Sequence, residues 1–194
     1  MRFIYATLAA ALVHTAASSA VSAVLETRVT PASLDCEEYG KYIGIHDGTG
    51  AEYSAGCADL TDACLKLNGT SIWSHAQCVA AATCQGTLGV IILNQCQNHN
   101  VAHAASIPNL SGTVYASIVG SVAAAAGDPI TQQNYIDFVF GQMSAANVTQ
   151  WPSYDYVVSN WWNPITSWTA TGNSIPYSNF DDWLHYSETD TDTK

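Results

Sequence analysis

The sequence contains few charged residues, and cationic residues are the scarcest. Charged residues make up 11% of the 194 residues, against roughly 25% in ordinary soluble domains. No Lys or Arg lies between Lys66 and Lys194, and the formal net charge at pH 7 is −11. A surface with so few cations cannot neutralise phosphate groups. Nucleic acid, anionic lipid and phosphorylated substrates are therefore excluded as expected partners.

The sequence also lacks an apolar run long enough to cross a bilayer, which takes about 20 residues. The apolar run from Phe3 to Val13 follows a single arginine and leads into small residues up to Ala23. This three-part layout is typical of a secretory signal peptide. We therefore expect residues 1–23 to be a signal peptide and the mature protein to be secreted, without a membrane span. In an alternative processing scheme, a short propeptide extends to Arg28.

Common catalytic motifs are missing as well. The sequence has no Gly-x-Ser-x-Gly elbow of the kind found in serine hydrolases. HNVAH at 99–103 sets two histidines four residues apart, as in a zinc-protease helix. However, Asn100 stands where that motif needs a glutamate as general base. Because no spacing nominates a third ligand, we expect neither a metal site nor a cofactor.

One domain accounts for the rest of the chain. Residues 29–187 contain no linker-like stretch, and on the order of 160 residues suffice for a single globular domain with its own core. Residues 188–194 are acidic and lack apolar side chains, so we expect a disordered tail. Asn-x-Ser/Thr sequons predict N-linked glycosylation. They lie at Asn68, Asn109 and Asn147.

The six cysteines all lie in the first half of the mature chain. An even count in a secreted protein predicts three disulfides, for which fifteen pairings exist. The cysteines are Cys36, Cys57, Cys64, Cys78, Cys84 and Cys96.

Helical spacing narrows these pairings. Residues 57–69 place Cys57, Leu60, Cys64 and Leu67 on one stripe of a helix that ends at Asn68-Gly69. Residues 74–84 form a second expected helix, with Ser74 as its N-cap. Within each helix the two cysteines are roughly 9 to 10 Å apart, which is too far for a bond.

An antiparallel helical hairpin brings these cysteines together in nested pairs. The pairs Cys64–Cys78 and Cys57–Cys84 are centred on the same turn between the two helices. We therefore predict both pairs, and Cys36–Cys96 by elimination. The prediction fails if Cys57 is joined to Cys64.

The second half of the chain also favours helices. We expect one at 112–127, with a strand over 113–119 as the competing interpretation. Thr131 is placed to cap another helix, with Ile130 and Tyr135 as its hydrophobic staple. A short helix at 178–187 begins with Ser178 and Asp181 at capping-box positions. The expected class is mainly α, and the alternative is α+β with a small sheet around 88–93 and 112–119.

The aromatic stretch at 154–168 offers the candidate binding residues. On a helix, Tyr154, Trp161 and Trp168 fall on one buried seam, whereas Trp162 and Tyr156 fall outside it. Pro164 should kink or end this helix. We therefore expect Trp161 and Trp168 in the core, and Trp162 and Tyr156 exposed as ligand-binding residues.

Exposed aromatics beside amide side chains, in a chain poor in cations, suit neutral sugar rings. The leading hypothesis is a binding protein for a neutral glycan or an extracellular protein partner. A rival hypothesis is a small glycosidase-like hydrolase that uses paired carboxylates from Asp155, Asp181 and Asp182. Asp181 and Asp182 also fit the first turn of a helix, where acidic residues are common. A third hypothesis is an effector or toxin that acts on another organism.

Overall fold

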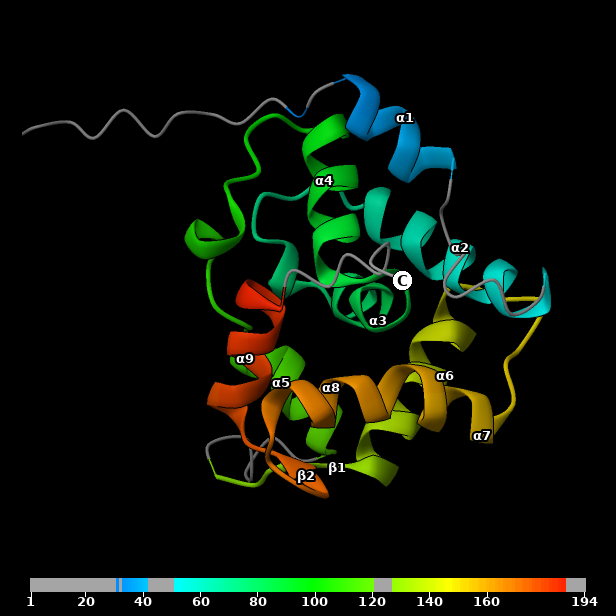
Figure 1. The fold of residues 1–194 in the computed structure, drawn as a ribbon, viewed down its shortest axis with the longest axis vertical. Helices are drawn as coiled ribbons and strands as arrows, with labels where there is room; N and C mark the ends of the chain where they lie inside the picture. The colour runs from blue at the N-terminus through cyan, green and yellow to red at the C-terminus, as the bar shows by residue number, and fades with distance from the viewer. Residues whose placement is uncertain (1–30, 32, 42–50, 121–126, 188–194) are drawn as a thin grey trace, which may run out of the picture.

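The computed structural model describes residues 31, 33–41, 51–120 and 127–187. The predicted signal peptide, the alternative propeptide and the acidic tail lie outside the described residues, as does part of the helix expected at 112–127. The described part is mainly helical and carries one two-stranded sheet (Figure 1). No helix within it is long and apolar enough to cross a membrane.

Four α-helices make up the first half of the described chain, with two short 3-10 turns. They are α1 (Ser33–Lys41), α2 (Ala51–Leu65), η1 (Ile72–Ser74), α3 (Ala76–Gln85), α4 (Thr87–Gln97) and η2 (Ala104–Ser106). The second half contains α5 (Gly112–Val119), β1 (Ile130–Thr131), α6 (Gln132–Ala145), α7 (Tyr154–Val157), the π-helical turn η3 (Val158–Trp162), α8 (Asn163–Thr169), β2 (Ser174–Ile175) and α9 (Tyr177–Tyr186). The strands pair antiparallel, with Ile130 opposite Ile175.

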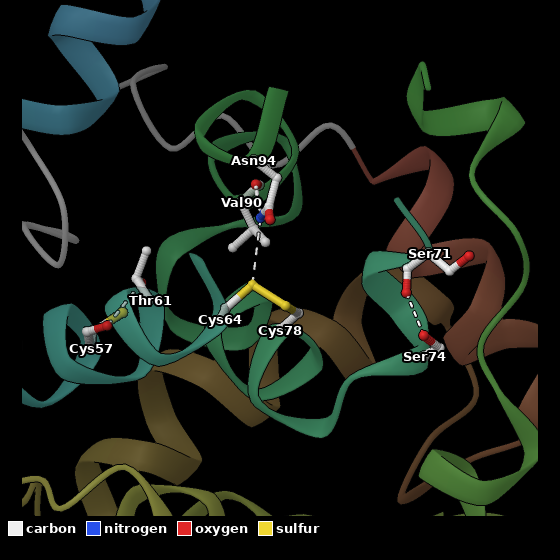
Figure 2. The surroundings of a disulfide bond; sticks show 8 residues. All are labelled: Cys57, Thr61, Cys64, Ser71, Ser74, Cys78, Val90 and Asn94. Atoms are coloured by element: carbon white, nitrogen blue, oxygen red, sulfur yellow. Dashed lines mark hydrogen bonds between the residues drawn. A yellow bond between two sulfur atoms is a disulfide. The ribbon is translucent and has the colours of Figure 1, made fainter. Parts of the chain in front are cut away.

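The predicted disulfides are confirmed. Cys64–Cys78, Cys57–Cys84 and Cys36–Cys96 are bonded, with Cα–Cα distances of 4.6, 5.9 and 5.8 Å. The first two join α2 to α3, and the third joins α1 to α4. Figure 2 shows the Asn94 side-chain amide of α4 donating to the sulfur of Cys64 at 3.4 Å. The described N-terminal region is thus the stapled helical hairpin that the spacing predicts, with α4 packed on it.

Two details of the predicted hairpin are wrong. Leu67 is 43% exposed, because α2 ends at Leu65 and the stripe does not continue into the turn. Ser74 does not cap α3, which begins at Ala76. Its hydroxyl instead donates to the carbonyl of Ser71 inside the 3-10 turn, as Figure 2 shows.

The strands considered for 88–93 and 112–119 are also wrong, since both stretches are helical. Residues 88–93 belong to α4, which buries Val90, Ile91 and Leu93. The other stretch lies within α5, whose first turn is capped by the Ser111 hydroxyl and which ends at Gly120 with φ 78°. Caps at both ends and burial of one face outweigh the strand preference of the β-branched residues.

Thr131 caps α6 as predicted, in a capping box completed by Asn134. At its other end, α6 stops in a Schellman motif. Asn147 has a left-handed φ of 56°, its N–H donates to Ser144 O at 3.1 Å, and the N–H of Val148 donates to Met143 O at 3.0 Å. The side chains of Met143 and Val148 are both buried. The direction in which Asn147 leaves the helix is therefore fixed.

Helix α3 lies at the centre of the core. All residues from Val79 to Ala82 are 0% exposed. The helix packs against α2, α4, α6 and η3, and Figure 1 shows it among α2, α4 and α6. Its alanines explain this position, because small side chains let several helices approach one axis while keeping a high helix propensity.

Gly56 allows α2 to approach the segment after α6. A Cβ at this position would lie 2.8 Å from the carbonyl oxygen of Gln150 and 3.0 Å from the Met143 methyl. We expect Gly56→Ala to lower the free energy of unfolding by about 1 to 3 kcal/mol, because backbone must move.

The matched control for this substitution is Gly141→Ala in α6, where nothing lies within 4 Å of an added Cβ. Here alanine should stabilise the helix by about 0.5 to 1 kcal/mol. Urea unfolding of both variants measures the difference. Equal changes in the free energy of unfolding in the two variants would contradict the close packing at Gly56.

Candidate functional site

The aromatic stretch at 154–168 is helical, but its buried face differs from the predicted seam. Trp161 is 3% exposed, as expected. Trp162 is also 3% exposed, so its predicted exposure is wrong. Trp168, expected in the core, is 42% exposed, and Tyr154 is 45% exposed. Trp162 packs on Tyr135, with ring centroids 5.1 Å apart, and is not available to a ligand in this arrangement.

The π-helical turn from Val158 to Trp162 explains the differences at Trp162 and Trp168, whereas Tyr154 precedes this turn. Within it the N–H of Asn163 donates to Val158 O, five residues back. Such a turn holds one more residue than an α-helical turn and shifts the following side chains around the helix axis. Trp168 is exposed as a result, whereas Ile165 remains buried. The turn directly precedes Pro164, whose ring would collide with the carbonyl four residues earlier in a regular α-helix. Trp161 and Trp162, which are adjacent in the sequence, are therefore both buried in the core.

Tyr156 is half-buried, which limits the exposure predicted for it. Its ring meets Trp161 edge-on at 6.1 Å. Burial of Tyr135, whose ring packs on Trp162, raises the pKa of its phenol. This side of α7 and η3 is therefore a packed aromatic interior.

The three candidate carboxylates have different surroundings. Asp181 is 8% exposed and accepts a hydrogen bond from the N–H of Leu110 at 2.7 Å. Asp182 on α9 and Asp155 on α7 are exposed. Helix α9 begins at Tyr177 after Pro176, so Ser178 does not cap it and Asp181 lies beyond its first turn. The capping-box prediction for this helix is wrong, because the helix starts earlier.

Asp181 belongs to a polar cluster under α9, which we define as Tyr177, Asp181, His185 and the backbone of 107–110. The His185 Nδ1 lies 2.7 Å from Asp181 O and 3.5 Å from the Asp181 carboxylate, and its Nε2 lies 2.9 Å from Ile107 O. The Tyr177 hydroxyl donates to Leu110 O at 2.5 Å. Burial first, and the charge of Asp181 second, raise the pKa of Tyr177. These bonds tie α9 to the loop before α5.

The histidines of the HNVAH stretch do not form a metal site with other described residues. His99 and His103 are exposed and lie after the end of α4, not on a helix. Within the described ranges, no group of three or more His, Cys, Asp or Glu side chains is placed to hold a metal ion.

The sequon residues are all exposed, as glycosylation requires. They are Asn68, Asn109 and Asn147.

Two exposed aromatic residues lie just before the stretch at 154–168 and at its start, three positions apart in the sequence. Trp151 and Tyr154 are each 45% exposed at the entry to α7, and we call them the aromatic edge. The Trp151 indole N–H donates to Val148 O at 2.8 Å, and its ring packs on Phe140 with centroids 5.7 Å apart. One side of the indole is therefore held in place while much of the ring remains open. The sequence contains one signal that Trp151 lies outside a helix. Trp151 directly precedes Pro152, and proline keeps the preceding residue out of a helix.

A polar pocket lies beside the same segment, between α2, the start of α3 and the end of α6. Its volume is about 280 Å3. Polar groups and small apolar side chains both line it. The lining residues are Asp59, Asp62, Ala63, Lys66, Leu67, Gln77, Ala145, Ala146 and Asn147.

Comparisons with protein-family models, with curated proteins and with solved structures find no match for this chain.

Proposed function

We propose that the protein is a secreted binding protein whose ligand is a neutral glycan, held on the aromatic edge of Trp151 and Tyr154. The observation that carries this proposal is the fixed, half-exposed indole of Trp151. A tryptophan presented in this way loses little side-chain freedom on binding, and its face suits the C–H face of a sugar ring.

The neighbouring side chains fit the same ligand. Gln150, Ser153 and Asp155 flank the two rings in sequence and are exposed. Their amide, hydroxyl and carboxylate groups can bond to sugar hydroxyls. The low cation content of the chain disfavours anionic ligands and leaves a neutral glycan as the better match. This surface replaces the one predicted around Trp162.

Catalysis by paired carboxylates has less support than binding. Asp181 is buried, and its carboxylate already accepts from a backbone N–H. A general acid must instead reach the glycosidic oxygen of a substrate in an open cleft. The hydrolase hypothesis would regain support if the purified protein cleaved neutral oligosaccharides.

The test is to screen the purified protein against an array of neutral oligosaccharides and to titrate the best binder by calorimetry. We expect Trp151→Ala and Tyr154→Ala each to weaken that affinity by about tenfold, which corresponds to 1.4 kcal/mol and lies in the range of aromatic contacts.

The matched control is Trp168→Ala, which removes an indole of similar exposure from α8. It should bind with unchanged affinity. Because Trp151→Ala also removes a hydrogen bond and a ring contact, thermal melting must accompany it. Tyr154→Ala separates lost binding from lost stability. No binder on the array, or equal losses in all three variants, would contradict the proposal.

A further inference from the structure

The polar pocket beside α6 has one property that sets it apart from an ordinary surface hollow. Its wall includes Asn147, the acceptor of an Asn-Val-Thr sequon. Neither Asn68 nor Asn109 lines this pocket. We propose that the first sugar of a glycan attached to Asn147 occupies the pocket and joins the end of α6 to α2 and α3.

The backbone holds Asn147 in a defined position at the pocket wall. The Schellman motif at the end of α6 fixes its left-handed conformation through the hydrogen bonds of Asn147 N and Val148 N. The buried Val148 anchors the next residue. A sugar on Asn147 therefore starts from a fixed point and does not swing from a free loop. Covalent attachment of this kind gives a high effective concentration at a neighbouring site.

The lining has the chemistry that a sugar needs. Asp59 and Asp62 offer acceptors for hydroxyl groups, and Lys66 and Gln77 offer donors. Within the described ranges, none of these four side chains has a hydrogen-bond or ion-pair partner of its own. Ala63, Ala145 and Ala146 give small apolar surfaces for the C–H groups of the ring.

The size of the pocket favours a single ring. At about 280 Å3 it lies just below the roughly 300 to 1,000 Å3 typical of sites for drug-sized ligands. The occupant is therefore the innermost sugar, and the outer part of the glycan extends into solvent. Both signs of charge line the pocket, which suits an uncharged, hydroxyl-rich group better than a simple ion.

The experiment uses the full chain secreted from a host that attaches N-linked glycans. Thr149→Ala removes the Asn147 glycan and leaves the asparagine in place. Thr70→Ala removes the Asn68 glycan and is the matched control, because both threonines are exposed. We expect the melting temperature of Thr149→Ala to fall by about 3 °C, the shift expected for a loss of order 1 kcal/mol in a chain of this size. Thr70→Ala should melt like the parent protein.

Two further measurements identify the sugar and its contacts. Trimming the glycans enzymatically to one N-acetylglucosamine should leave the melting temperature of the parent unchanged. Gln77→Ala should lower the melting temperature of the glycosylated protein but not that of the Thr149→Ala background, since contacting groups are energetically coupled.

Three results would overturn the proposal. The first is a mass spectrum that shows Asn147 unmodified in the secreted protein. The second is equal melting of Thr149→Ala and Thr70→Ala. The third is a Gln77→Ala effect that is the same with and without the Asn147 glycan. None of these results bears on ligand binding at the aromatic edge, which is tested separately with Trp151 and Tyr154 variants.

Discussion

Replacing Cys57 and Cys84 together by alanine is expected to lower the free energy of unfolding by about 4 kcal/mol. The bond has a sequence separation of 27 residues, but the intact Cys64–Cys78 bond shortens the path to the 7 residues from 57 to 64 plus the 6 from 78 to 84. Closing this loop of about 13 residues accounts for roughly 3 kcal/mol of chain entropy in the unfolded state. Both cysteines are buried, so the lost sulfurs also leave unfilled space between α2 and α3. Small domains have only about 5 to 15 kcal/mol in total, so much of the stability would be lost.

The third disulfide provides the informative control. Cys36–Cys96 closes a longer segment, with a separation of 60 residues, and loop entropy alone would rank it above the others. However, it holds α1, which packs mainly on α4 and leaves Leu34 73% exposed. We expect its removal to free α1 locally and to cost less globally than removal of Cys57–Cys84.

Urea unfolding followed by near-UV circular dichroism measures both double variants. A larger loss for the Cys36 and Cys96 variant than for the Cys57 and Cys84 variant would show that loop length, and not packing at the hairpin, decides the contribution of each bond.

Asp181→Ala is expected to cost about 3 kcal/mol. The substitution leaves the buried N–H of Leu110 without its acceptor, for which the desolvation penalty is roughly 1 to 3 kcal/mol. It also removes the carboxylate 3.5 Å from His185 Nδ1.

Asp181→Asn separates these two effects, because the amide oxygen can still accept from Leu110 while the charge is gone. We expect it to cost less than half as much as Asp181→Ala in urea unfolding. If the two variants lose the same stability, charge and not the backbone hydrogen bond is what Asp181 contributes. Normal stability combined with abolished hydrolysis in Asp181→Asn would instead point to catalysis.

The sequence predicted those parts of the structure that depend on local periodicity. The nested pairs of Cys57, Cys64, Cys78 and Cys84 follow from the spacing of one helical face and the turn between two helices, and all of these residues are bonded as predicted. Thr131 caps α6 because its capping box needs only residues within one turn. Short-range stereochemistry was sufficient in both cases.

The candidate binding residues were not predictable in the same way. A wheel of 100° per residue places Trp162 outside the seam, and one π-turn before Pro164 is enough to bury it. The contact between Asp181 and Leu110 joins positions 71 residues apart. No local pattern identifies such a pair, because it depends on how α9 packs against the loop before α5.

The nesting of the disulfides also bears on the order in which the chain assembles. The three disulfides have sequence separations of 14, 27 and 60 residues. Because the entropy cost of closing a loop rises with its length, Cys64–Cys78 is the easiest of them to form in the unfolded chain. Once Cys64 and Cys78 are bonded, the chain path between Cys57 and Cys84 is shortened through that bond. The bond between Cys57 and Cys84 then completes the hairpin of α2 and α3. Helix α4, which contains Cys96, packs on this hairpin. Oxidative folding can therefore proceed outward from the turn between α2 and α3, because each disulfide lowers the entropy cost of forming the next one.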